Sequence, residues 1–72
     1  MPKLPALRAA EIVRMLERAG FVRVRQAGSH LRLRRGNLAV TVPLHSGDVP
    51  EMVVRSILRQ AQLTADEFLA LR

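Results

Sequence analysis

Two histidines are the side chains of this 72-residue chain that are best suited to moving a proton near neutral pH. His30 follows a Gly-Ser pair, and His45 follows a Pro-Leu pair. A base that takes the proton from the 2′-hydroxyl of RNA lets that oxygen attack the adjacent phosphate, and a nearby cation stabilises the added negative charge. His30 is therefore a candidate catalytic residue for phosphodiester cleavage in RNA.

Aliphatic residues alternate with arginines around His30 and in the segment before it. Period-two alternation is typical of strands with one buried and one exposed face. We predict that helices cover the face formed by Val22, Val24, Leu31, Leu33, Leu38, Val40 and Val42. The opposite, open face would display Arg23, Arg25, His30, Arg32, Arg34 and Thr41. A shift of one residue would bury every charge, so alternation is expected to fix these faces.

Each candidate also has a plainer explanation. His30 could be one more polar residue on an exposed strand, and alternation alone leaves both interpretations open. His45 is the only other candidate acid or base, but a loop histidine that hydrogen-bonds the backbone is the favoured interpretation. Ser29 could bind phosphate or position His30, although a serine beside glycine more often serves a turn. No Ser-His-Asp pattern supports Ser29 as a nucleophile.

The charge and composition of the chain point to a polyanionic partner. The net charge is +6, and Lys3 is the only lysine among 12 basic residues. Arginine binds phosphate through a planar fork of donors, so the expected partner is a nucleic acid, an anionic membrane or an acidic protein. Without cysteine no thiolate metal site can form, two histidines make a poor zinc site, and no carboxylate cluster suggests Mg²⁺. No apolar run resembles a signal peptide or membrane span, so we expect a cytoplasmic protein.

The periodicity predicts an α-β-β-β-α order within a single domain, residues 1–72. The expected elements are a helix over 8–19, strands over 21–25, 30–34 and 38–42, and a helix over 50–61. Residues 44–49 are expected to form a loop, and a capping box beginning at Thr64 opens a short final helix. This α+β class, with helices on one face of an antiparallel three-stranded sheet, is the arrangement of double-stranded-RNA-binding domains.

Four blocks in this order resemble the HicA toxin family: Gly20-Phe21, Gly28-Ser29-His30, Thr41-Val42-Pro43-Leu44-His45 and Arg55-Ser56-Ile57-Leu58-Arg59-Gln60. The resemblance runs from about residue 8 to residue 70. It implies a metal-independent endonuclease that cuts mRNA, with no cofactor, and a HicB-type antitoxin that masks its site. It also implies that the catalytic histidine is His30. The segment 7–10 departs from the family, in which a Ser or Thr cap and a Lys are common there.

The leading interpretation is a toxin that cleaves RNA with His30 as general acid or base. The phosphates would be held by Ser29, Arg23, Arg25, Arg32 and Arg34, with His45 as an accessory residue. One alternative is a module that binds double-stranded RNA by shape without cutting it. Another is an inactive decoy that only sequesters an antitoxin. His30 favours cleavage, because binding alone would be served better by another arginine or lysine.

Overall fold

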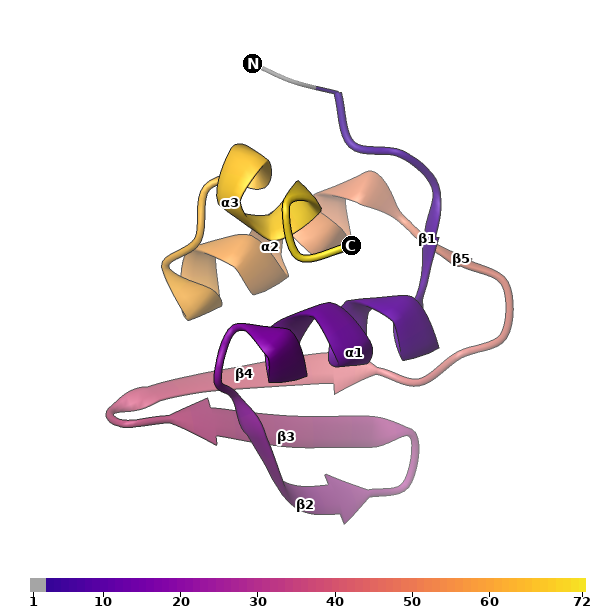
Figure 1. Ribbon diagram of the computed structural model, residues 1–72. Helices are drawn as coiled ribbons and strands as arrows, with labels where there is room; N and C mark the ends of the chain where they lie inside the picture. The colour runs from indigo at the N-terminus through magenta and orange to yellow at the C-terminus, as the bar shows by residue number, and fades with distance from the viewer. Residues whose placement is uncertain (1–2) are drawn as a thin grey trace.

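The computed structural model describes residues 3–72 and confirms the predicted α-β-β-β-α order. Two short strands, one before the first helix and one between the third strand and the second helix, were not predicted. The elements are β1 (Leu7–Arg8), α1 (Ala9–Arg18), β2 (Val22–Ala27), β3 (His30–Arg35), β4 (Leu38–Pro43), β5 (Asp48–Val49), α2 (Glu51–Ala61) and α3 (Ala65–Leu69). All three helices lie together on one side of the three-stranded sheet (Figure 1), an arrangement like that of double-stranded-RNA-binding domains.

The helix ends follow from local chemistry. At the start of α1, where no Ser or Thr cap is present, the Arg8 N–H donates to Glu11 Oε1 at 3.2 Å. The α2 helix begins after Pro50 and ends before its C-cap residue Gln62, which adopts a left-handed φ of 56°. The α3 helix has the predicted capping box, in which the Glu67 N–H donates to Thr64 Oγ1 at 3.1 Å. Local hydrogen bonds therefore set helix starts even where the preferred cap is missing.

The main sheet is antiparallel with the order β2-β3-β4. Two-residue turns join its strands, with Ala27 paired to His30 at the first turn and Arg35 paired to Leu38 at the second. Both turns begin with a glycine at a φ of 58°. The strongly alternating β3 strand behaves as predicted: Leu31 and Leu33 are buried, while His30, Arg32 and Arg34 are exposed.

A second, two-stranded sheet joins the start of the chain to the segment that was expected to be a loop. Leu7 pairs with Val49, and Arg8 pairs with Asp48. Leu7 is fully buried, so this small sheet anchors β1 against the core. Two residues are too few to show any alternation, which is why the sequence did not predict these strands.

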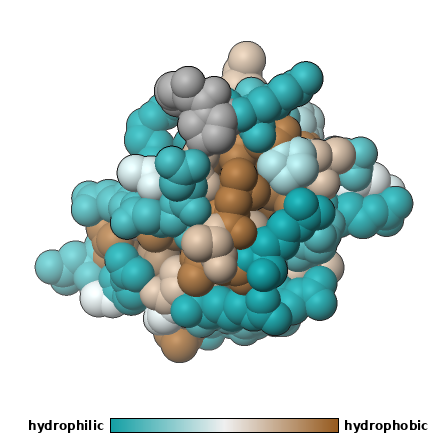
Figure 2. Space-filling view, turned by 45° about the horizontal axis from the view of Figure 1, so that its top comes forward, coloured by the Kyte–Doolittle hydropathy of each residue, from teal (hydrophilic) through white to brown (hydrophobic). Residues whose placement is uncertain are grey.

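The hydrophobic core lies between the helices and the sheet. Its largest fully buried side chains come from all layers of the fold: Phe21, Phe68, Leu7, Ile12, Leu16, Leu33, Ile57, Val40, Val42 and Val54. On the face shown in Figure 2, hydrophilic side chains surround a narrow apolar strip. Among the described residues no polar or charged side chain is buried, so the charges are free to act at the surface.

The faces predicted for β2 are wrong in its first half. The register steps from Arg23↔Leu33 to Arg25↔Arg32, so Val24 is the extra residue of a β-bulge. Bulges are common on edge strands, and alternation alone does not show them. As a result Val22 and Val24 are 59% and 49% exposed, where burial was expected. Arg23 moves to the helical face, opposite Leu33.

Candidate functional site

His30 is the first residue of the central strand β3, immediately after the Gly28-Ser29 turn. It is exposed, and it pairs with Ala27 on β2 and Pro43 on β4. Gly28 adopts a φ of 58°, a left-handed conformation that costs L-residues free energy but that the achiral glycine adopts readily. The turn therefore fixes where the histidine enters the sheet. Its side chain lies on the open face, as predicted.

A shallow depression on the open face surrounds His30. The residues that line it are Arg25, Ala27, His30, Arg32 and Thr41. The register explains this grouping, because Arg25, Arg32 and Thr41 stand side by side on three successive strands. Two guanidinium groups and one imidazole thus share one hollow, and none of its lining residues is acidic. An anion such as a phosphodiester fits this charge arrangement.

The arginines of this depression are not neutralised within the protein. Across residues 3–72, the side chains of Arg25 and Arg32 make no hydrogen bond or ion pair, and the Arg34 side chain donates only to the Gly36 carbonyl at 3.4 Å. The ion pairs lie elsewhere: Glu17 with Arg23, Glu51 with Arg55, and Glu11 with Arg72. The open face therefore keeps positive charge available for a ligand.

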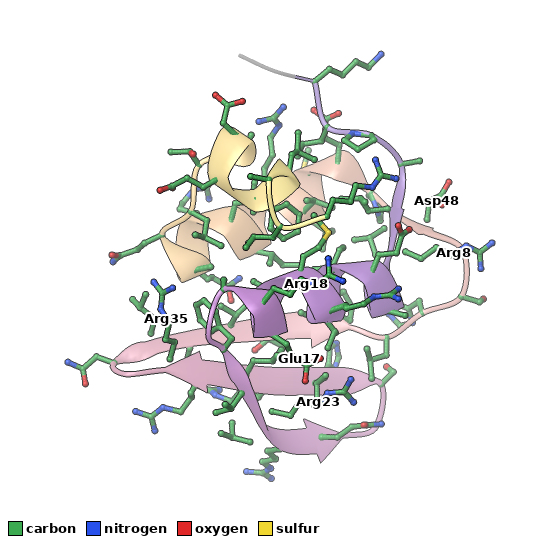
Figure 3. All side chains as sticks on the ribbon, viewed as in Figure 1. Arg8, Glu17, Arg18, Arg23, Arg35 and Asp48 are labelled. Atoms are coloured by element: carbon green, nitrogen blue, oxygen red, sulfur yellow. The ribbon has the colours of Figure 1, made fainter. Side chains whose placement is uncertain are left out.

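Arg23 does not belong to this open face, contrary to prediction. Its Nε lies 3.2 Å from Glu17 Oε2 on α1 (Figure 3). The β-bulge causes the change, since it places Arg23 opposite the buried Leu33. Arg23 instead lines a second hollow, together with residues of α1 and the loop after β4. Its predicted contact with phosphate stays a prediction.

The structure brings His45 next to His30. The ring centroids are 6.4 Å apart and the planes meet at 80°. The Leu44 N–H donates to the Ser29 carbonyl, which joins the loop carrying His45 to the turn before His30. The sequence held a signal for this: a two-residue turn at 36–37 pairs residue 30 with residue 43, so His45 falls two positions beyond the partner of His30. Sequence reasoning favoured an ordinary loop role and did not use that register.

A model of a known family matches most of the chain. The model described as the HicA toxin of bacterial toxin–antitoxin systems matches residues 9–63. This chain belongs to the HicA toxin family. The match spans α1 through α2, and it includes both histidines and the whole three-stranded sheet. A search of curated protein sequences found no significant match.

Membership of the HicA family places the chain in a toxin–antitoxin system, whose toxins are paired with an antitoxin.

Ser29, the predicted phosphate ligand, is exposed in the turn beside His30. Within residues 3–72 no group of three or more His, Cys, Asp or Glu side chains could hold a metal ion. No helix in the same range is long and apolar enough to cross a membrane.

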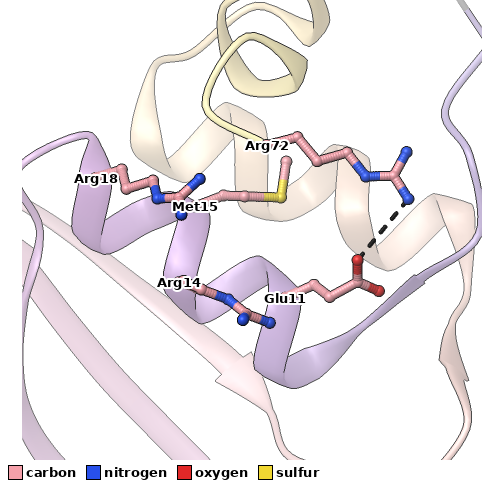
Figure 4. A pocket seen from close by; sticks show the side chains of 5 residues that line it. All are labelled: Glu11, Arg14, Met15, Arg18 and Arg72. Atoms are coloured by element: carbon pink, nitrogen blue, oxygen red, sulfur yellow. Dashed lines mark ion pairs between the residues drawn. The ribbon is translucent and has the colours of Figure 1, made fainter.

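A second arginine cluster lies on the helical side of this HicA-family fold. Arg14, Arg18 and Arg72 line a hollow with Glu11 and Met15 (Figure 4). Arg72 pairs with Glu11 at 3.8 Å, and Arg18 donates to the Leu71 carbonyl at 2.9 Å. These contacts tie the end of the chain to α1. In the part of the chain that the structure describes, no histidine lines this hollow, and its one acidic residue, Glu11, is paired with Arg72.

Proposed function

We propose that this HicA-family toxin is a metal-independent endoribonuclease that cleaves mRNA with His30 as a general acid or base. One observation carries the proposal: the exposed His30 shares a depression with Arg25 and Arg32, neither of which has an acidic partner in the described chain. A proton-transfer group beside free cations suits phosphodiester cleavage. A site built for binding alone would gain nothing from an imidazole at this position.

The residues of the depression have separate tasks in this reaction. Arg25 and Arg32 bind the non-bridging oxygens of one phosphate and stabilise the charge that grows in the transition state. His30 contacts a reacting oxygen of the same phosphodiester. The 2′-oxygen forms a bond to phosphorus as the bond to the 5′-oxygen breaks. The fragments then carry a 2′,3′-cyclic phosphate and a free 5′-hydroxyl.

The partner that we propose is a HicB-type antitoxin that covers the open face. Arg25 and Arg32 present unneutralised positive charge beside His30, and Arg34 adds charge further along β3, so acidic side chains of an antitoxin fit this surface. An antitoxin seated there excludes RNA from the same arginines. Inhibition then follows from direct occupation of the site.

The fold itself favours one second candidate, a module that binds double-stranded RNA without cutting it. Its helices and sheet are arranged as in double-stranded-RNA-binding domains, which recognise the shape of the duplex. The two candidates predict different fates for bound RNA. A binding module leaves the RNA intact, whereas the proposed enzyme yields fragments.

The test uses the purified protein with RNA in the presence of EDTA. DNA of the same sequence serves as the matched control, because it lacks the 2′-hydroxyl. The proposal predicts RNA fragments that end in a 2′,3′-cyclic phosphate and intact DNA. RNA that is bound but stays whole would support the binding module, and cleavage of the DNA would exclude attack by a 2′-hydroxyl.

A further inference from the structure

We propose that His45 is a second catalytic residue, which acts on the same phosphate as His30 from the opposite side. One histidine accepts the proton of the attacking 2′-hydroxyl, and the other donates a proton to the departing 5′-oxygen. This inference rests on the proposed ribonuclease function. It assigns a role to a residue that the cleavage scheme above does not use.

The geometry of the displacement calls for two groups. The attacking and leaving oxygens lie roughly in line on opposite sides of phosphorus. A catalytic group must come within about 2.6–3.2 Å of the atom whose proton it moves. One imidazole cannot meet that condition at both oxygens at once. A site with His30 alone would leave one of the two proton transfers to water.

The two rings are spaced for such a shared task. Their centroids are 6.4 Å apart, so both rings lie within reach of a single phosphate group. The rings meet edge to face at 80°, and within the described chain no hydrogen bond joins them. Neither histidine therefore uses a ring nitrogen to bind the other. A phosphate group can therefore contact both rings.

The backbone holds this pair in place. His30 begins β3, and the bond from the Leu44 N–H to the Ser29 carbonyl fixes the loop that carries His45. The two rings line separate hollows: His30 lines one on the open face, and His45 lines one beside α1. RNA that lies across the end of the β2–β3 hairpin would meet both.

The charged residues that line the two hollows are all arginines. Arg25 and Arg32 line the hollow of His30, and Arg23 lines the hollow of His45. From α1 the second hollow receives only the apolar residues Ala9, Ala10 and Val13. No lining carboxylate competes with the histidines for the proton. The histidines are therefore the proton-transfer groups that the two hollows offer.

The first experiment compares the pH–rate profiles of the wild type, His45→Ala, His45→Gln and His30→Ala, with melting temperature as the folding control. The wild type should show a bell-shaped profile, because one histidine must be neutral and the other protonated. Both His45 variants should lose about 10²- to 10⁴-fold in rate and keep only one limb of the bell. Glutamine retains a hydrogen-bond donor. If His45 only positioned another group, His45→Gln would therefore keep the wild-type rate and the bell-shaped pH–rate profile.

The second experiment replaces the bridging 5′-oxygen of the substrate by sulfur, a leaving group that needs no protonation. The variant that lacks the general acid should recover cleavage of this substrate, whereas the variant that lacks the base should not. Recovery in one of the two histidine variants supports the pair.

If His45→Ala cuts with the rate and bell of the wild type while His30→Ala is inactive, the inference is wrong and the proposed function stands. If the wild type does not cut RNA at all, the proposed function itself fails. The proposal of two catalytic histidines would also be overturned if His45→Ala cut slowly, kept the full bell-shaped pH–rate profile and did not recover on the sulfur substrate.

Discussion

Replacing Gly28 by alanine tests whether the turn before His30 positions the site. Gly28 has a φ of 58°, and a Cβ built there meets nothing within 4 Å. The cost of Gly28→Ala is therefore conformational rather than steric. A left-handed L-residue costs about 1–2 kcal/mol, and the stiffer unfolded chain offsets about 0.4–1 kcal/mol of that. We expect a net loss of about 1 kcal/mol, or a melting temperature lower by about 4–8 °C.

Gly36 supplies a matched control within the same chain. It also has a φ of 58° with nothing within 4 Å of a built Cβ, but its turn lies at the other end of β3. Gly36→Ala should therefore lose about the same free energy of unfolding. Only Gly28→Ala disturbs the backbone that precedes His30 and that holds the loop of His45 through Ser29.

The assay measures thermal unfolding and RNA cleavage for both variants at a temperature at which both are folded. A displacement of about 1 Å in a catalytic group can cost about 10²-fold in rate. We expect a loss approaching that size for Gly28→Ala and a rate close to wild type for Gly36→Ala. Equal cleavage by the two variants, at equal stability, would refute the positioning role of the Gly28 turn.

Three further predictions concern charge. Arg32→Ala and Arg34→Ala should each reduce the log–log salt slope of RNA binding by about 0.7 to 0.9, measured by titration, because each loses a phosphate contact. Arg59→Ala on the helical side is the control. An equal decrease of the salt slope in this variant would count against the open face as the RNA-binding surface. An acidic antitoxin present at about 100 times its dissociation constant should raise stability by roughly 2.7 kcal/mol and block RNA binding. RNA binding that persists in the complex would contradict masking. The N–H and hydroxyl of Thr64 hold the pKa of Glu67 below its usual value. The stability that the Glu67 carboxylate contributes to the fold is therefore present at pH values above its usual pKa. That stability is lost as the pH falls through the lowered pKa of the folded protein. Acid titration of unfolding should show a smaller loss in Glu67→Gln.

The sequence predicted those parts of the fold in which local signals are strong. Leu31 and Leu33 alternate with charged residues on the central strand, and both faces of β3 came out as expected. The Thr64 capping box also formed as predicted, because its hydrogen bonds join residues only three apart. In both places the local pattern and the overall fold favour the same structure.

The misplaced parts depend on contacts between distant segments. Val22, Val24 and Arg23 follow a regular alternation, but an extra residue in an edge strand reversed their faces. The pairing of β1 with β5 joins residues about forty positions apart through only two residue pairs. Predicting the contact between His30 and His45 requires the register of the β3–β4 hairpin. That register follows from the turn only after both flanking segments have been assigned as strands.

The most direct test of the central claim is RNA cleavage by folded His30→Ala in EDTA, measured beside the wild type under single-turnover conditions. His30 is exposed, so the substitution should leave the melting temperature close to that of the wild type. Loss of a general acid or base predicts a rate lower by about 10² to 10⁴. A folded His30→Ala protein that cuts RNA at the wild-type rate would contradict the account.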